Sequence, residues 1–296
     1  RIMAFNLSLG SISSNRSYTP SIGSGVTVTY GRVVDVILDE NHPEYKNRGG
    51  GVAINGVFYK PLSSNASEKS LTELPFAYQQ GAQIKVVPLI GEIVRVSPLP
   101  IPSDNDFNGK TRRYYTNILN IWNNANSNFY PDVDNNFDID FTQQNKFIEL
   151  GNVNPIASSP GDVQIEGRQG QSLRFSGGKA LSNPWTDDDN VGKPLIILSN
   201  GQKETNEGFS LIGENVNEDR SSIYMVSDHQ VPLVQASEKR DAWNDPPVKG
   251  DQFKGNQVII NGGRLYFNAK ENDIQLSSVS SIGMNTEGTV NIDSKD

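Results

Sequence analysis

The last 24 residues repeat one pattern of apolar and polar positions in three consecutive blocks of eight, 273–280, 281–288 and 289–296. Two apolar residues that are two positions apart point to the same face of a β-strand. Each block therefore predicts one short strand with two inward-facing side chains, followed by a turn. The apolar residues at the second and fourth places of the blocks are Ile274, Leu276, Ile282, Met284, Val290 and Ile292.

Three such strands are too few to bury a hydrophobic core within one chain. Each repeat of a stacked array is stabilised by its neighbours, and short strands also leave unpaired backbone edges. We therefore expect further copies of the chain to supply the missing strands, so that the apolar residues meet along the axis of an intertwined shaft. Leu265 and Phe267 lie nine residues before Ile274 and Leu276. The expected shaft core therefore begins in the preceding segment.

Residues 26–100 hold the densest strand pattern. Segments 26–40, 51–60 and 82–100 are rich in valine and isoleucine, and the last of them predicts two strands, 84–87 and 92–96. The dipeptide Asn55-Gly56 indicates a turn, although its flanks could equally form one bulged strand. Several short strands in so little chain favour a small closed barrel such as the OB-fold, with a small β-sandwich as the alternative.

The pattern changes after residue 100. The proline-rich stretch 97–106 predicts an extended linker, and the apolar spacing in 111–126 predicts a short helix. Short strand patterns return in 161–168, 172–177, 193–202, 221–228, 256–262 and 264–269. The resulting fold class is all-β, organised as an N-terminal arm (1–25), an OB-fold domain (26–100), a linker with a short helix (101–160), a β-rich base (161–270) and an octad-repeat β-prism (271–296).

Composition narrows the classes of partner. The formal net charge of −8 argues against nucleic acid or an anionic membrane as the main partner. The absence of cysteine excludes disulfides and thiolate metal sites. No apolar run approaches the roughly 20 residues that a membrane span needs, so we expect no stable membrane anchor. The hydrophobic fraction of 35% and the 27 glycines are typical of a β-rich chain with many turns.

No motif for catalysis or ligand binding stands out. His42 and His229 have no second histidine at metal-ligand spacing, and both fit ordinary loop positions. The alternating acidic run 132–140 lacks the glycine and the final glutamate of a calcium loop. No nucleophile elbow and no phosphate-binding loop occur. The sequence therefore predicts no enzyme activity, no cofactor and no metal site.

One stretch carries a resemblance to a known family. Segment 151–178 reads GNVNPIASSPGDVQIEGRQGQSLRFSGG and is similar to a stretch of the central spike proteins of T-even-like contractile-tailed phages, which are related to the spikes of type VI secretion systems. The matching residues are Asn152, Asn154, Pro155, Pro160, Gly161, Asp162, Val163, Glu166, Gly167, Arg168, Gly170, Ser172, Leu173, Arg174 and Phe175. Segments 114–123, 192–202, 218–228 and 256–278 also match, whereas 26–96 matches in strand pattern and position alone.

The resemblance implies a homotrimeric structural protein of the virion. An OB-fold would dock on the trimeric hub of the tail baseplate, and a trimeric β-prism or β-helix would point away from the tail tube. The partners would be two further copies of the chain, the hub protein, a spike-tip protein and the baseplate wedge proteins. Assembly would take place in the host cytoplasm, and the spike would serve to penetrate the host envelope.

Two alternatives remain at this stage. The best-known family members carry a lysozyme domain between the OB-fold and the spike, but segment 103–150 is far too short for one and has no matching catalytic glutamate. A peptidoglycan-degrading tail enzyme is therefore one alternative. A glycan- or nucleic-acid-binding OB module on a fibrous stalk is the other.

Overall fold

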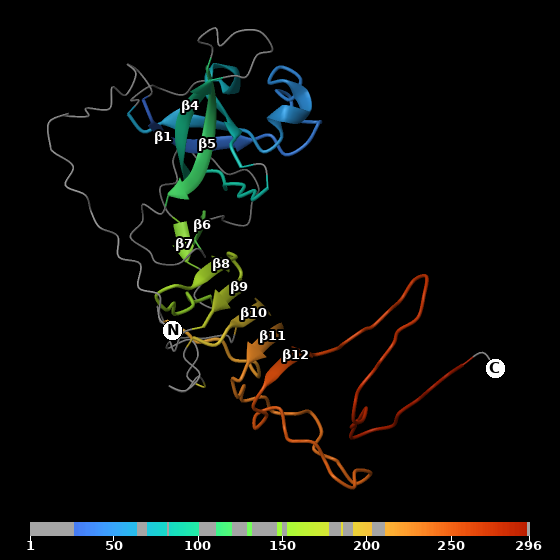
Figure 1. The fold of residues 1–296 in the computed structure, drawn as a ribbon. Coiled ribbons are helices and arrows are strands. Elements are labelled where there is room, and N and C mark those ends of the chain that lie inside the picture. Colours follow the sequence, from blue (N-terminus) through green and yellow to red (C-terminus); the bar gives the residue numbers. More distant parts are fainter. Residues whose placement is uncertain are drawn as a thin grey trace, which may run out of the picture. The chain divides into compact units, whose positions relative to one another are not determined.

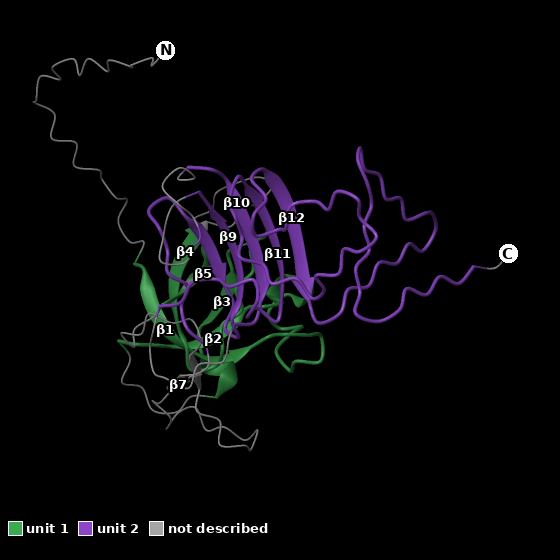
Figure 2. Ribbon diagram, turned by 90° about the horizontal axis from the view of Figure 1, so that it is seen from below, with its two compact units in different colours: residues 1–119 green, residues 120–296 purple. Residues whose placement is uncertain are grey.

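The chain divides into two compact units, residues 1–119 and 120–296 (Figure 2). The computed structural model describes residues 27–63, 70–81, 83–100, 111–119, 129–131, 147–149, 153–177, 185, 192–202 and 211–294. Regular structure in these ranges is almost entirely β. Two short 3-10 turns, Gly50–Ala53 and Leu71–Glu73, are the helical elements among the described residues. No helix in these ranges is long and apolar enough to cross a membrane.

The first unit is a closed five-stranded barrel with the strand order β1-β2-β3-β5-β4 (Figure 1). Strand β3 pairs with β5 in parallel, and the other neighbours are antiparallel. Closure leaves no free sheet edge around most of the barrel. The strands are β1 (Thr29–Val36), β2 (Val57–Pro61), β3 (Phe76–Gln79), β4 (Ile93–Pro100) and β5 (Thr111–Leu119).

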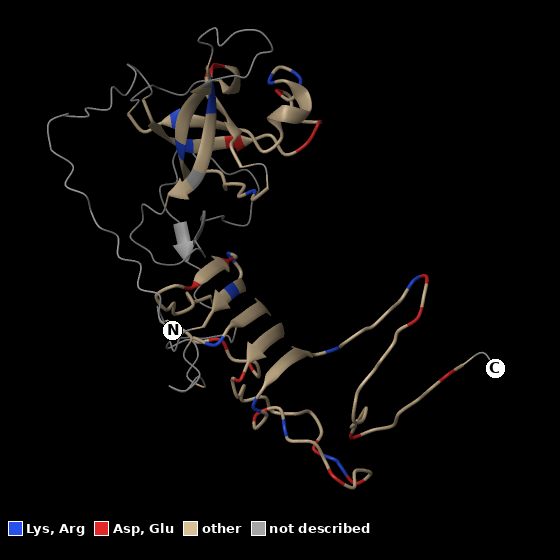
Figure 3. Cartoon of the chain, viewed as in Figure 1, with Lys and Arg blue, Asp and Glu red and all other residues tan. Residues whose placement is uncertain are grey.

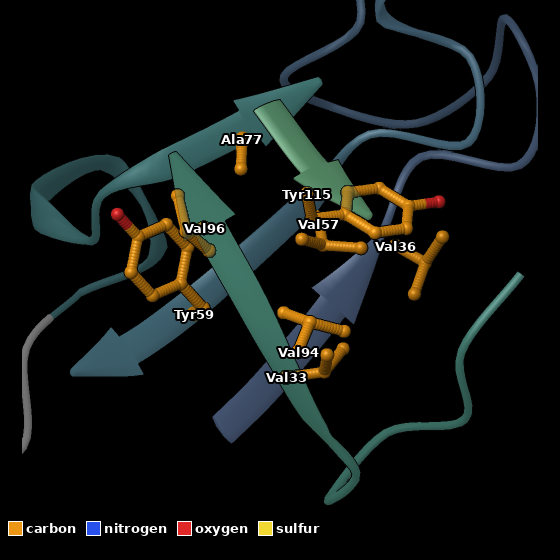
Figure 4. Packing of buried hydrophobic residues seen from close by; sticks show 8 residues of the cluster. All are labelled: Val33, Val36, Val57, Tyr59, Ala77, Val94, Val96 and Tyr115. Carbon is orange, nitrogen blue, oxygen red and sulfur yellow. The ribbon is translucent and has the colours of Figure 1, made fainter. Parts of the chain in front are cut away.

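The barrel core draws side chains from all five strands, as Figure 4 shows. Tyr115 is fully buried, and its hydroxyl donates a hydrogen bond of 2.7 Å to the Asn55 carbonyl oxygen. Burial raises the pKa of Tyr115 to about 12. The buried cluster is Val33, Val36, Val57, Tyr59, Ala77, Val94, Val96 and Tyr115.

The turn predicted at Asn55-Gly56 is confirmed. Residues Gly50–Ala53 form a 3-10 turn, Asn55 has a positive φ of 63°, and β2 begins only at Val57. A Cβ at Gly56 would lie 2.2 Å from the Phe76 ring, so this close approach requires glycine. The alternative of a single bulged strand is therefore wrong.

Three expectations for the barrel region are wrong. Residues 111–119 form strand β5 instead of a helix, because β3 and β4 both need this strand to close the barrel, and its tyrosines and threonines suit a pleated surface. The predicted linker at 97–106 begins inside β4, which continues to Pro100. Segment 84–87 forms no strand and leaves Ile84 75% exposed, whereas β3 lies within a segment where no strand was predicted.

The second unit contains a five-stranded antiparallel sheet in the order β12-β11-β10-β9-β8 (Figure 1). The predicted strands in these segments are confirmed, except that 264–269 forms none in the single chain. A separate pair joins β6 (Phe129–Pro131) to β7 (Phe147–Glu149). The sheet strands are β8 (Val163–Glu166), β9 (Gln171–Ser176), β10 (Leu195–Asn200), β11 (Ser221–Ser227) and β12 (Asn256–Gly262).

Candidate self-association interface

One face of the β8–β12 sheet carries two rows of apolar side chains that run across all five strands. We call these two rows the apolar stripe. The strand register aligns one residue from each strand in each row, because every neighbouring pair is antiparallel without a bulge. One row is Val163, Phe175, Ile196, Met225 and Val258, and the other is Ile165, Leu173, Leu198, Ile223 and Ile260.

The described chain leaves the apolar stripe uncovered. Seven of its side chains are exposed, from 39% for Met225 to 64% for Val258, and the other three are partly buried. Strands about 4.8 Å apart give the stripe a length of about 20 Å. Strands β10, β11 and β12 carry no charged residue (Figure 3), and the charged residues of β8 and β9, Glu166 and Arg174, lie on the opposite face. A contiguous apolar surface of this kind marks an interaction site.

The opposite face of the same sheet is covered by its own chain. Leu195, Ile197, Tyr224 and Val226 alternate with the stripe residues and are buried against loop residues such as Val231. The central strands β10 and β11 therefore alternate between a covered and an uncovered side that are both apolar. Strands β8 and β9 carry polar and charged residues such as Glu166 and Arg174 on the covered side. Strands that are apolar on both faces are typical of sheets buried on both faces.

The eight predicted shaft-core residues are also uncovered. Their exposed fractions run from 48% for Leu265 to 84% for Ile292, and residues 263–294 form no strand within the single chain (Figure 1). The pairing of the octads between chains stays a prediction. The residues are Leu265, Phe267, Ile274, Leu276, Ile282, Met284, Val290 and Ile292.

Sequence reasoning missed the apolar stripe, although a signal was present. The segments LIIL (195–198) and IYMV (223–226) place apolar residues two positions apart on both sides of β10 and β11. A strand with one solvated face would alternate apolar and polar residues. The departure from that alternation in β10 and β11 indicates a second buried face.

A buried cluster of charged residues links the loop segments 157–162 and 211–219 to the covered face of the sheet. The Arg174 guanidinium is fully buried and lies 2.9 Å from the Glu214 carboxylate and 3.8 Å from that of Asp162. It also donates a hydrogen bond of 3.4 Å to the Ala157 carbonyl oxygen. Arg174, one of the residues in the 151–178 resemblance, therefore has a structural role in holding segments 157–162 and 211–219.

The cluster holds more acid than base. Burial raises the pKa of Glu214 to about 7, in spite of the nearby Arg174, and burial also raises the pKa of Glu166. The Arg174 guanidinium contacts the two buried carboxyls of Asp162 and Glu214 and can neutralise only one of them, which favours protonation of Glu214. A neighbouring cavity of about 230 Å³ is lined by Ile156, Ser172, Ser199, Gln202, Ile212, Gly213, Glu214, Asn215, Glu218 and Asp219.

Both histidines have structural contacts. His229 is fully buried, with its Nε2 atom 3.1 Å from the Lys193 carbonyl oxygen and its ring edge-on to Trp185. His42 Nε2 lies 3.1 Å from Asp35 Oδ2, and its ring stacks on Phe58. Within the described ranges no group of three or more histidines and acids is placed to hold a metal ion. The acidic run 132–140 lies outside those ranges.

We predict that Glu214→Gln weakens the pH dependence of stability. The folded-state pKa of about 7 exceeds the ordinary 4.5, so the folded state retains a proton that the unfolded state loses as pH rises between these values. Wild-type stability should therefore fall across this window by up to about 3 kcal/mol, and the variant should lose most of this slope. Urea unfolding near pH 5 and near pH 8 measures this change in the free energy of unfolding. The exposed control Glu271→Gln should keep the wild-type slope, and a slope equally steep in Glu214→Gln would contradict the prediction.

Comparison with protein-family models, curated proteins and solved structures found no match to this chain. The features that bear on function are the apolar stripe, the exposed apolar residues of the C-terminal segment and the resemblance in 151–178. These features concern assembly instead of catalysis.

Proposed function

We propose that this protein is the structural central spike of a contractile phage tail baseplate and that it acts as a homotrimer. The observation that carries the proposal is the apolar stripe, an uncharged sheet face that one chain leaves exposed. The eight apolar residues of the C-terminal segment are likewise exposed in the single chain and also need a partner surface to be buried. Burial of such surface stabilises association by about 25 cal/mol per Å².

A trimer provides cover for both surfaces. In a closed cyclic assembly each copy meets the next through the same pair of surfaces, so three stripes can face a common axis with no exposed apolar side remaining. The C-terminal octads would then intertwine, because each extended segment gains the strand partners that it lacks alone. The stripe supports association between copies of the chain but does not specify how many copies associate. The proposed number of three chains comes from the family resemblance.

The barrel is the proposed attachment domain. Its strand order β1-β2-β3-β5-β4, closed with a parallel β3–β5 pair, supports an OB-fold-like barrel. In the proposed assembly this barrel docks on the trimeric hub protein at the end of the tail tube, near the wedge proteins. A spike-tip protein would cap the opposite end.

In this role the assembled chains form a rigid shaft that transmits force. Contraction of the tail drives the spike against the host envelope, and a shaft with an apolar axis and a polar exterior resists bending while it remains soluble. The proposal requires neither a catalytic residue nor a cofactor.

Electron microscopy of contractile particles with a gold-labelled antibody against residues 271–296 tests the proposal. We expect label at the distal centre of the baseplate. An antibody against the major tail-tube protein provides the positional control. Label along the sheath, at the head or at no site on intact particles would contradict the proposed location.

A further inference from the structure

The barrel carries a groove beside the start of β5. The groove has a volume of about 890 Å³ and lies between residues 72–76 on one side and the start of β5 on the other. Buried Leu74, Phe76 and Val96 contribute to its lining. All of its lining residues belong to the first unit.

The described strands leave one edge unpaired at the start of β5, beside this groove. Residues 111–113 of β5 pair with β4, at Pro100, Leu99 and Pro98. On the other side β3 reaches only Tyr114 and Tyr115, so no described strand pairs with 111–113 there. An unpaired strand edge exposes backbone N–H and C=O groups that an extended peptide can bind by adding a strand.

The groove is also basic, although the whole chain is acidic. Three arginines, Arg48, Arg112 and Arg113, line it together with one acid, Glu73. Arg113 is exposed on β5, and the Arg112 guanidinium lies 4.9 Å from the centre of the Tyr78 ring. Neighbouring residues of a strand point to opposite faces, so Arg112 and Arg113 flank the free edge on both sides.

Arg48 has a fixed position on the opposite side of the groove. Its guanidinium lies 5.1 Å and 5.5 Å from the centres of the Phe58 and Phe76 rings, and it donates a hydrogen bond of 3.4 Å to the Thr72 carbonyl oxygen. Its own carbonyl oxygen accepts a hydrogen bond of 2.9 Å from the Tyr78 hydroxyl. Arg48 Nε also lies 3.7 Å from the Glu44 carboxylate, so the positive charge of the groove comes mainly from Arg112 and Arg113.

We infer that this groove binds an extended, acidic polypeptide segment of a partner protein as an added strand on β5. Carboxylates on both faces of the segment would pair with Arg112 and Arg113, whose planar guanidinium groups suit carboxylates. Single-stranded nucleic acid fits less well, because bases bind by stacking on available aromatic rings, whereas the half-buried Tyr78 ring of the groove already packs against Arg112, Phe76 and Tyr114. The inference goes beyond the proposed function and holds whether or not the chain is a phage spike.

Binding of a labelled peptide to the full chain tests this inference. The probe is a fluorescein-labelled peptide of glutamates and threonines, and fluorescence anisotropy gives its affinity. A matched probe with alternate backbone amides N-methylated keeps the charges but cannot complete the strand pairing. We expect the wild-type chain to bind the first probe at least about tenfold more tightly than the second.

Two protein variants distinguish the specific contribution of Arg112 and Arg113 to peptide affinity from the general electrostatic attraction between the peptide and the protein. The double variant Arg112→Gln/Arg113→Gln should weaken binding at least about tenfold, whereas Arg95→Gln, an exposed arginine of β4 outside the groove, should bind like the wild type. Melting temperatures of both variants verify that the barrel is folded. Equal binding of both probes, or equal losses in both variants, would overturn the inference. Displacement of the peptide by a lower concentration of oligothymidylate would assign the groove to nucleic acid instead.

Discussion

A chain carrying both Leu198→Asp and Met225→Asp is expected to be a monomer under conditions in which the wild-type chain is a trimer. These residues lie on the neighbouring strands β10 and β11, one in each row of the apolar stripe. Assembly would bury both carboxylates in each of the copies, and an unpaired buried charge costs several kcal/mol. Sedimentation-velocity ultracentrifugation at about micromolar concentration measures the change.

The matched control is Leu38→Asp. Leu38 is 63% exposed and belongs to the barrel unit, so it is not part of the stripe. This variant should keep the wild-type sedimentation coefficient, because the new charge stays in water. A trimeric double variant would contradict the assignment of the apolar stripe to the interface. The single-chain far-UV circular dichroism should change little, because both substituted side chains are already partly solvent-exposed in the isolated sheet.

The pair Ile282→Asp and Met284→Asp is expected to disrupt the C-terminal shaft. Both residues take the inward places of the middle octad, and the single chain leaves them 53% and 65% exposed. In an intertwined shaft their carboxylates would face the axis from every chain, and repulsion would add to the desolvation cost. Resistance of residues 271–296 to proteolysis, followed by mass spectrometry, measures the loss of the shaft.

Substitutions at neighbouring polar places provide the comparison. Ser281→Asp with Asn285→Asp adds the same charge to the same octad at positions expected to face water. That variant should resist proteolysis like the wild type. Equal protease resistance in both double variants would show that Ile282 and Met284 do not face the axis.

Local patterning predicted most strands, but it failed where closure of the barrel decides the structure. Residues 111–119 have helix-like apolar spacing, and only the pairing with β3 and β4 makes them a strand. The error also concealed the basic groove. Arg112 and Arg113 fall in the segment assigned to a linker, so residues 26–96 alone showed no basic cluster.

The candidate interface was predicted in part. The octads indicated missing partners because their period is visible within 24 residues. The apolar stripe depends instead on the register of five strands separated by long loops, and no local window shows that Phe175 lies beside Ile196. The contacts of Arg174 with Asp162 and Glu214 likewise arise only when distant loops fold onto the sheet.

Native mass spectrometry of the full chain at about micromolar concentration tests the central claim most directly. The account predicts one dominant species at three times the protomer mass of 32.5 kDa. A chain that remains monomeric, or that stops at a dimer, would contradict it.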